Sequence, residues 1–251
     1  MLLRKLYIAL LATFLAWIAP QIQAAASPPK LTAYTEIFFP ISYKDENTQK
    51  FTGHATNILR QVMDDAGFDY TIKLHSWARS YKSTLNSPGT LLYSVARTPG
   101  RESKFIWLQK ITQLDYGLYT TQIEDTELSL EKAKTARIAV TRGGISHQTL
   151  LDNGFKNFIF IDDYSRISQL VTRERVSIIF ASSFWYKYNK GNLSKPLYKL
   201  KNINLSVSDI DLYFVINKET EPDIVNKLKK SFKKILNGKA IDFNHTLTPE
   251  N

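Results

Sequence analysis

The chain contains no cysteine among its 251 residues. Disulfide bonds, thiol catalysis and metal sites built on thiolates are therefore excluded. Histidine is also scarce, and the four residues at positions 54, 75, 147 and 245 share neither a ligand spacing nor a predicted element, so we expect no metal site. A hydrophobic core must hold the fold, and a content of 43% hydrophobic and 12% aromatic residues is sufficient for one.

Long apolar runs are missing after the first 26 residues. At the N-terminus, Arg4 and Lys5 precede an apolar stretch from Leu6 to Ala19, Pro20 breaks it, and Ala24-Ala25-Ala26 follow. This is the pattern of a signal peptide with cleavage after Ala24 or Ala26. The apolar stretch is shorter than the about 20 residues of a membrane span, and no cysteine follows to carry a lipid. We expect residues 1–26 to be removed and the mature protein to be exported and free.

The formal charge is +10, and loss of Arg4 and Lys5 leaves 31 basic against 23 acidic residues, a net of +8. Such a balance can indicate a nucleic-acid partner. The basic residues are dispersed, however, apart from one cluster of lysines at positions 227, 229, 230, 233 and 234 on the polar side of a helical pattern. A cluster of this kind is typical of a solvated helix face. We therefore expect no nucleic-acid partner. A basic module that binds nucleic acid or another surface remains an alternative function.

Strand and helix patterns alternate along the chain, which predicts the α/β class. The first half predicts strands and helices at Leu31–Glu36, from Ala55 to a C-terminal cap at Gly67, at Phe68–His75, at Trp77–Leu85 and around Leu91. The second half predicts them at Asp115–Thr121, Thr126–Lys134, Arg137–Thr141, from Ser146 as N-cap to Gly154, and at Phe158–Ile161, Tyr164–Thr172 and Val176–Phe180, followed by a helix capped by Ser182 or Ser183.

A last strand, Leu212–Ile216, and a helix from Pro222 to Gly238 are too small to form a lobe alone. They must return to an earlier lobe, so the chain crosses twice between two βα lobes. We predict lobe 1 from residues 27–114 and 208–251, and lobe 2 from residues 115–207. A double crossing makes a hinge, and the cleft between such lobes is a common ligand site.

Two arginines flank a turn that follows a buried strand. Leu91, Leu92 and Tyr93 form an apolar run that leads through Ser94 into Arg97-Thr98-Pro99-Gly100-Arg101-Glu102. A guanidinium at such a place can bind a small carboxylate through two parallel hydrogen bonds. Taken alone, the turn is more typical of two solvated arginines. For Arg97 and Arg79 we expect structural ion pairs or a place on the rim of the cleft.

In order along the chain come the signal peptide, Phe38-Phe39-Pro40, Gly53, Trp77-Ala78-Arg79, the arginine turn, Trp107 and Gly143-Gly144. This ordered set resembles the bacterial extracellular solute-binding proteins of family 3, the periplasmic amino-acid-binding type, over nearly the whole mature chain. The resemblance implies a class II periplasmic binding protein fold, a periplasmic and monomeric protein without cofactor, and a membrane transporter or sensor as partner.

The resemblance also implies roles for individual residues. Arg101, three residues after Thr98, matches the arginine that holds the ligand's carboxylate, and Phe38 and Trp77 match an aromatic pair around the ligand's side chain. Ser94 matches a ligand-contacting serine. The backbone N–H groups from Gly144 to Ser146 match a second carboxylate contact at a helix N-terminus.

Two positions depart from the family pattern. Where many members carry an acidic residue for the ligand's α-ammonium, this chain has Ala181-Ser182-Ser183, and Ala96 replaces a usual serine or threonine. Because a buried unpaired ammonium is costly, we expect a small carboxylate-bearing solute, an amino acid or a related compound. Glu36 in lobe 1 is the candidate substitute for the missing acid.

The leading hypothesis is thus a binding protein that closes on its ligand and is not an enzyme. A second hypothesis is a dehydratase-like enzyme on the same scaffold, since a fold does not fix a function. Such an enzyme needs a poised acid or base, for which Glu36, His54 and Asp115 are the candidates. The Gly143-Gly144 pair has neither the spacing of a phosphate-binding loop nor that of a dinucleotide-binding loop.

Overall fold

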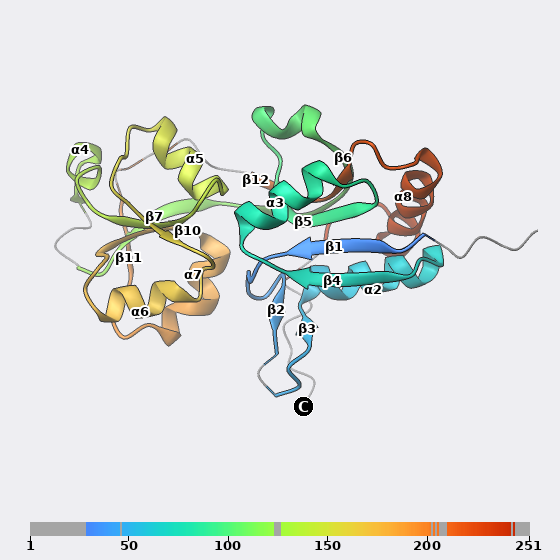
Figure 1. The fold of residues 1–251 in the computed structure, drawn as a ribbon. Helices are drawn as coiled ribbons and strands as arrows, with labels where there is room; N and C mark the ends of the chain where they lie inside the picture. The colour runs from blue at the N-terminus through green and yellow to red at the C-terminus, as the bar shows by residue number, and fades with distance from the viewer. Residues whose placement is uncertain are drawn as a thin grey trace, which may run out of the picture.

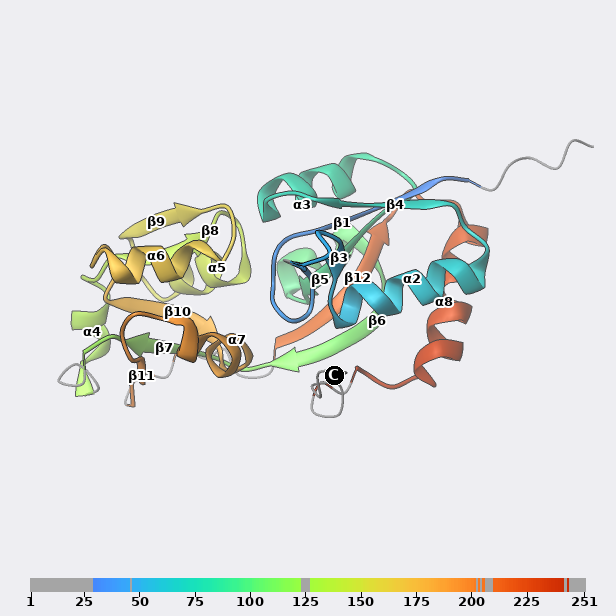
Figure 2. The same cartoon turned by 90° about the horizontal axis from the view of Figure 1, so that it is seen from below.

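The computed structural model describes residues 29–45, 47–122, 127–201, 203, 205, 210–241 and 243. The predicted signal peptide, residues 1–26, lies outside this part of the chain. None of the helices in these described ranges has both the length and the apolar character that a membrane crossing requires. The chain forms two α/β lobes, each on its own sheet, as the alternating pattern predicts (Figures 1 and 2).

Lobe 1 is built on a five-stranded sheet. Its strands, in order across the sheet, are β4 (Tyr70–Leu74), β1 (Leu31–Thr35), β5 (Thr90–Ala96), β12 (Ile210–Asn217) and β6 (Phe105–Leu114). β1 runs parallel to β4 and β5, whereas β12 runs antiparallel to β5 and β6. A strand from the C-terminal part of the chain therefore lies between two strands of the first half, and the chain crosses twice between the lobes.

Helices cover both faces of this sheet (Figure 2). On one face α2 (His54–Ala66) packs against α8 (Pro222–Leu236), and on the other lies α3 (Trp77–Asn86). β5 serves both layers, because Leu91 and Tyr93 face α2 and α8 whereas Leu92 faces α3. A strand buried on both faces has a continuous apolar sequence rather than an alternating one.

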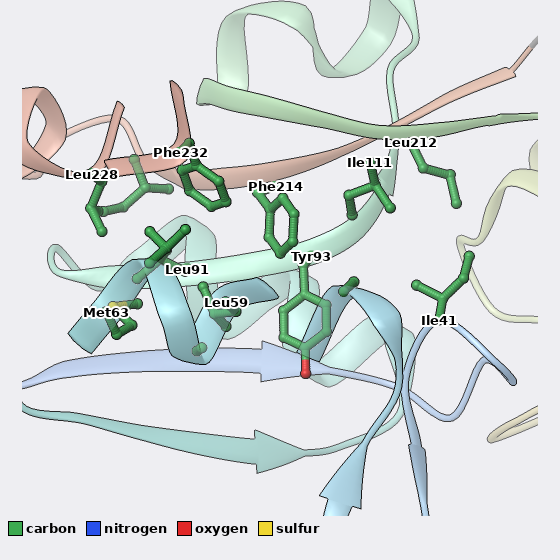
Figure 3. Close-up of a cluster of buried hydrophobic side chains, with 14 of the residues drawn as sticks. Ile41, Leu59, Met63, Leu91, Tyr93, Ile111, Leu212, Phe214, Leu228 and Phe232 are labelled. Carbon is green, nitrogen blue, oxygen red and sulfur yellow. The ribbon is translucent and has the colours of Figure 1, made fainter. Parts of the chain in front are cut away.

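The core of lobe 1 joins α8 to the sheet (Figure 3). Phe232 of α8 lies against Phe214 of β12 with ring centroids 4.7 Å apart, and Leu228 beside it is fully buried. The five clustered lysines of α8 are all exposed on its other side, as its amphipathic pattern predicts. The α2 cap is confirmed too: Gly67 has φ +69°, a conformation that glycine adopts without strain.

Lobe 2 has a second five-stranded sheet. Its order is β11 (Tyr198–Lys199), β7 (Tyr116–Thr120), β10 (Ile178–Ser182), β8 (Ile138–Thr141) and β9 (Phe158–Ile161). β8 runs parallel to β9 and β10, and β7 runs antiparallel to β10. One core cluster includes α4 (Leu130–Ala133) and α5 (Ile145–Asp152), and another, on the opposite face, includes α6 (Arg166–Thr172) and α7 (Ser183–Asn189).

The remaining elements are short. They are the hairpin of β2 (Tyr43–Lys44) and β3 (Phe51–Thr52), and the 3₁₀ helices η1 (Pro99–Lys104) and η3 (Lys190–Asn192). The hairpin projects from the lower side of lobe 1, below β4 in the view of Figure 1. η1 contains Arg101 and is the turn that the sequence predicts between the two arginines.

The structure confirms most predicted elements and corrects three details. The N-cap of α5 is Gly144, so the prediction of Ser146 as the cap is wrong, and Ser146 lies in the first turn. The helix predicted at Thr126–Lys134 is described only as the four residues of α4. β6 has no counterpart in the prediction, because its sequence is neither alternating nor continuously apolar. Of the two predicted caps of α7, the Ser182 side chain accepts the Trp185 N–H.

Candidate functional site

A small cavity lies between the lobes, where the carboxyl ends of parallel strands from both sheets face each other. In α/β sheets this edge is where ligands bind, because the loops there diverge. The cavity has a volume of about 20 Å³, enough for about one water molecule. It is lined by Glu36, Phe38, Trp77, Ser94, Ala96, Arg101, Tyr116, Thr141, Gly144, Ile145, Tyr164 and Leu212.

Ser94 lies in a β-bulge of β5. Tyr213 of β12 pairs with Val95 and Val215 pairs with Leu92, so two residues of β5 face one of β12. Ser94 has φ +67°, a strained value for a residue other than glycine. Its buried hydroxyl has no hydrogen-bond partner in the described part of the chain. The bulge thus holds Ser94 in a strained backbone conformation, and its unpartnered hydroxyl belongs to a residue that lines the cavity.

Glu36 follows β1 directly and is 7% exposed. Its Oε2 atom finds no hydrogen-bond partner among the described residues. Burial, and then the negative charge of Asp163, raise the pKa of Glu36 to about 8, although the positive charge of Arg101 acts in the opposite direction. At neutral pH this carboxyl is therefore mostly protonated.

Arg101 is 8% exposed and points inward from η1. Its Nη1 donates to the Ala96 carbonyl at 3.1 Å, and its guanidinium lies over the ring of Trp77 with Cζ 4.9 Å from the centroid. Burial lowers the pKa of Arg101, but an arginine keeps its charge at any physiological pH. The site therefore contains a fixed positive charge.

Arg97, on the other side of the same turn, has a different environment. Its Nη2 forms an ion pair with Glu102 Oε1 at 2.6 Å, and its guanidinium lies 5.1 Å from the ring centroids of Trp107 and Tyr213. It does not line the cavity. The predicted structural ion pair of Arg97 is confirmed.

One carbonyl of lobe 2 joins the lobes. Gly143 O accepts Trp77 Nε1–H at 3.0 Å and Arg101 Nη2–H at 3.1 Å, both from lobe 1. Trp77, Arg101 and Gly143 also line a larger outer groove of about 940 Å³. We call the three residues the latch, because their hydrogen bonds join lobe 1 to lobe 2. The structure therefore shows the lobes closed on each other.

Lobe 2 contributes neutral groups to the inner cavity. Gly144 N–H already donates to the Thr141 carbonyl at 3.0 Å, and a side chain at Gly144 would collide with Thr141. The N–H groups of the next residues open α5, where a helix has no internal acceptors for them. Ser146 is buried away from the cavity, and its hydroxyl lies 2.6 Å from that of Tyr164.

Three aromatic rings complete the walls. Phe38 stacks on Tyr164 across the lobes with centroids 6.0 Å apart and an interplanar angle of 22°. Tyr116, at the start of β7, is half-buried and lines the same cavity. Burial raises the pKa of Tyr164 to about 12 and that of Tyr116 well above its usual value, so both phenols stay neutral hydrogen-bonding groups.

The structure brings six of the eight predicted site residues to the inner cavity: Glu36, Phe38, Trp77, Ser94, Arg101 and Gly144. Thr98 lines the outer groove instead, and Ser146 reaches the cavity only through Tyr164. Sequence analysis missed Tyr116, Thr141 and Tyr164. Each stands at the end of a strand or just beyond one, and position at a strand end was the signal that could have found them.

The latch gives a test of closure. We expect Trp77→Phe to keep a ring under Arg101 but to remove the Nε1–H bond to Gly143, worth about 1 kcal/mol. The ratio of open to closed protein should rise about fivefold, measured without solute by fluorescence energy transfer between dyes on the two lobes. Trp107→Phe is the matched control, because Trp107 Nε1–H donates within lobe 1, to Glu102 O at 3.1 Å. Equal transfer efficiency in both variants would contradict the latch.

Comparison with known proteins places the fold. No family model matches the chain. No curated protein matches it in sequence. Solved structures do match it, at low sequence identity.

An ancestral arginine-binding protein bound to glutamine is 18% identical, with 82% of this chain and 91% of that chain covered and a TM-score of 0.70. A histidine kinase sensor domain with similarity to periplasmic binding proteins is 13% identical, with coverage of 83% and 91% and a TM-score of 0.70. An arginine-specific periplasmic binding protein from Salmonella typhimurium is 14% identical, with coverage of 82% and 92% and a TM-score of 0.67. The chain thus has the two-lobed fold of periplasmic binding proteins.

Proposed function

We propose, with this shared fold as the premise, that the chain is an exported solute-binding protein. It captures a small polar carboxylate-bearing solute, an amino acid or a related compound, between its lobes. The observation that carries the proposal is Arg101, a buried cation beside a cavity at the carboxyl ends of both sheets. A buried guanidinium of this kind is suited to a carboxylate.

The proposed site has a role for each wall. Arg101 holds the carboxylate, Trp77 and Phe38 enclose the apolar part of the solute, and Ser94 and Glu36 supply polar contacts. The N–H groups that open α5 reach the solute from lobe 2. We assign Thr98 and Ser146 supporting positions, at the rim and behind Tyr164.

The proposal includes a place and a partner. Residues 1–26 direct export to the periplasm, residues 27–114 with 208–251 form lobe 1, and residues 115–207 form lobe 2. The monomeric protein presents its solute to a membrane transporter or sensor. Similarity to a histidine kinase sensor domain supports a sensor as partner, and similarity to an arginine-specific periplasmic binding protein supports the solute-binding role.

A thermal-shift screen tests the proposal. Ligand that binds only the folded protein stabilises it by RT ln(1 + [L]/Kd), about 2.7 kcal/mol at a concentration 100 times Kd. For a protein of this length we expect Tm to rise by about 5–10 °C with at least one of the L-amino acids or small carboxylic acids. A flat screen would contradict the proposal.

Only one of the three candidate acid–base residues of the enzyme alternative lines the inner cavity. His54 packs edge-on against Phe243, with centroids 4.9 Å apart, and neither His54 nor Asp115 is among the residues that line the inner cavity. Glu36 remains as a carboxyl with a raised pKa in that cavity, which is the property of a general acid. Turnover of a screened acid that is lost in Glu36→Gln, while binding persists, would favour the enzyme.

A further inference from the structure

Both charged groups of the inner cavity come from lobe 1. Arg101 reaches it from η1 and Glu36 from the end of β1. They influence each other electrostatically, yet no ion pair joins them among the described side chains. Glu36 Oε2 and Ser94 Oγ are also the two buried atoms of this cavity that lack hydrogen-bond partners within the described residues. Such atoms in a native site need a partner that the protein itself does not supply.

Among its described residues, lobe 2 places no acid at the cavity. Its lining residues, Tyr116, Thr141, Gly144, Ile145 and Tyr164, are neutral. β10 ends in Ala181 and Ser182, and the Ser182 side chain is already bound to the Trp185 N–H at 3.0 Å. Asp163 comes close enough to affect Glu36, but it does not line the cavity and its Oδ1 accepts the Ser165 N–H at 2.8 Å.

We propose that the solute is a zwitterion and that lobe 1 alone neutralises both of its charges. Arg101 pairs with the carboxylate, and Glu36 Oε2, with the Ser94 hydroxyl beside it, accepts the ammonium. This inference rests on the proposed function and narrows it. A monocarboxylate without an amino group would leave Glu36 Oε2 unpartnered, and an amine without a carboxylate would leave Arg101 unpaired.

Binding should release a proton. Four titratable groups act on Glu36 or face it: Arg101 from η1, Asp163 from the loop after β9, Tyr164 beyond it, and Tyr116 from β7. Together with burial, these groups leave the Glu36 carboxyl mostly protonated at neutral pH when no ammonium is bound. An ammonium binds the ionised form, so the proton must leave. Below pH 8, the affinity for a zwitterion should therefore rise close to tenfold for each unit by which the pH increases.

The experiment compares matched probes. Each L-amino acid that shifts Tm is titrated calorimetrically against the wild-type protein, together with the α-hydroxy acid of the same side chain. We expect the amino acid to bind at least 100-fold more tightly than the hydroxy acid at pH 7. Its affinity should rise about tenfold from pH 6 to pH 7, with release of close to one proton, determined in buffers of different ionisation enthalpy.

Glu36→Gln is the central variant. It should weaken the amino acid at least 30-fold, abolish the pH dependence, and change the hydroxy acid less than threefold. Ser94→Ala should weaken the amino acid about fivefold. If Glu36→Gln does not fold, proton release and the pH slope of the wild-type protein still decide the matter.

The outcomes separate this inference from the proposed function. If hydroxy acids bind as tightly as amino acids, or if affinity falls as pH rises, the protein is a binding protein but Glu36 does not accept an ammonium. In the second case a protonated Glu36 donates a hydrogen bond to the solute instead. If neither class of probe binds, the proposed function and this inference both fail.

Discussion

Arg101→Ala is expected to weaken binding of the best solute from the screen by at least 100-fold. The guanidinium is buried and fixed by the Ala96 carbonyl and the ring of Trp77, so it is preorganised for a carboxylate. Truncation of one partner in a buried, hydrogen-bonded charge pair costs about 2–5 kcal/mol. A loss of about 3 kcal/mol corresponds to a factor of more than 100 in Kd.

Arg97→Ala is the matched control, since it removes the same group from the same turn. Arg97 pairs with Glu102 on the outside of lobe 1, so its loss should change Kd less than threefold. Arg101→Lys separates charge from shape, because lysine keeps the charge but not the planar fork. Calorimetric titration of the three variants measures the effect. A similar Kd for Arg101→Ala and Arg97→Ala would remove Arg101 from the site.

The second large effect is a loss of stability as pH rises. In the unfolded chain Glu36 has its ordinary pKa of 4.5, whereas in the folded protein the pKa is about 8. Between these values the folded state binds more protons than the unfolded state, so the free energy of unfolding falls with pH. The difference in pKa corresponds to about 4–5 kcal/mol. We expect Tm of the ligand-free protein to fall by about 10 °C between pH 5 and pH 8.5.

Glu36→Gln should remove this loss, because glutamine resembles the protonated carboxyl in shape and stays neutral. The measurement is the difference in Tm between variant and wild type across the pH range. Glu102→Gln is the control: Arg97 lowers the pKa of exposed Glu102, so its effect is confined to acid pH. His54, His75 and His147, whose pKa values burial lowers, are common to all three proteins. Parallel curves for wild type and Glu36→Gln would contradict the raised pKa.

The sequence predicted the lobes well because their elements are locally encoded. The apolar stripe of α8 follows the 3.6-residue period of a helix. The cap of α2 is a glycine in the left-handed conformation that ends many helices. The continuous apolar run of β5 likewise predicted a buried strand. β6 was not predicted, because its residues are mostly half-buried and follow no period of two or 3.6. Its place in the sheet is set by pairing with β12, which is distant in the chain.

The site was predictable in part. Arg101, Trp77 and Phe38 could be found because a family resemblance assigns them roles. The stack of Phe38 on Tyr164 could not, since it joins two lobes, and no local pattern encodes a contact of that kind. The bulge at Ser94 was also invisible, because its cause is the register of β12 and not the residues beside it. The orphaned oxygen of Glu36 is a property of packing alone.

The carbonyl of Gly143 has a consequence for affinity. It accepts hydrogen bonds from Trp77 Nε1–H and Arg101 Nη2–H, so the chain carries an internal competitor for the guanidinium that the solute's carboxylate needs. The apparent Kd is the intrinsic Kd divided by the fraction of molecules in which that competitor is displaced, so the apparent affinity is lowered by this fraction. Residues that do not contact the solute can therefore change the solute concentration at which the protein responds. A partner that recognises only the closed arrangement of the lobes would bind the protein without solute as well as the protein with solute.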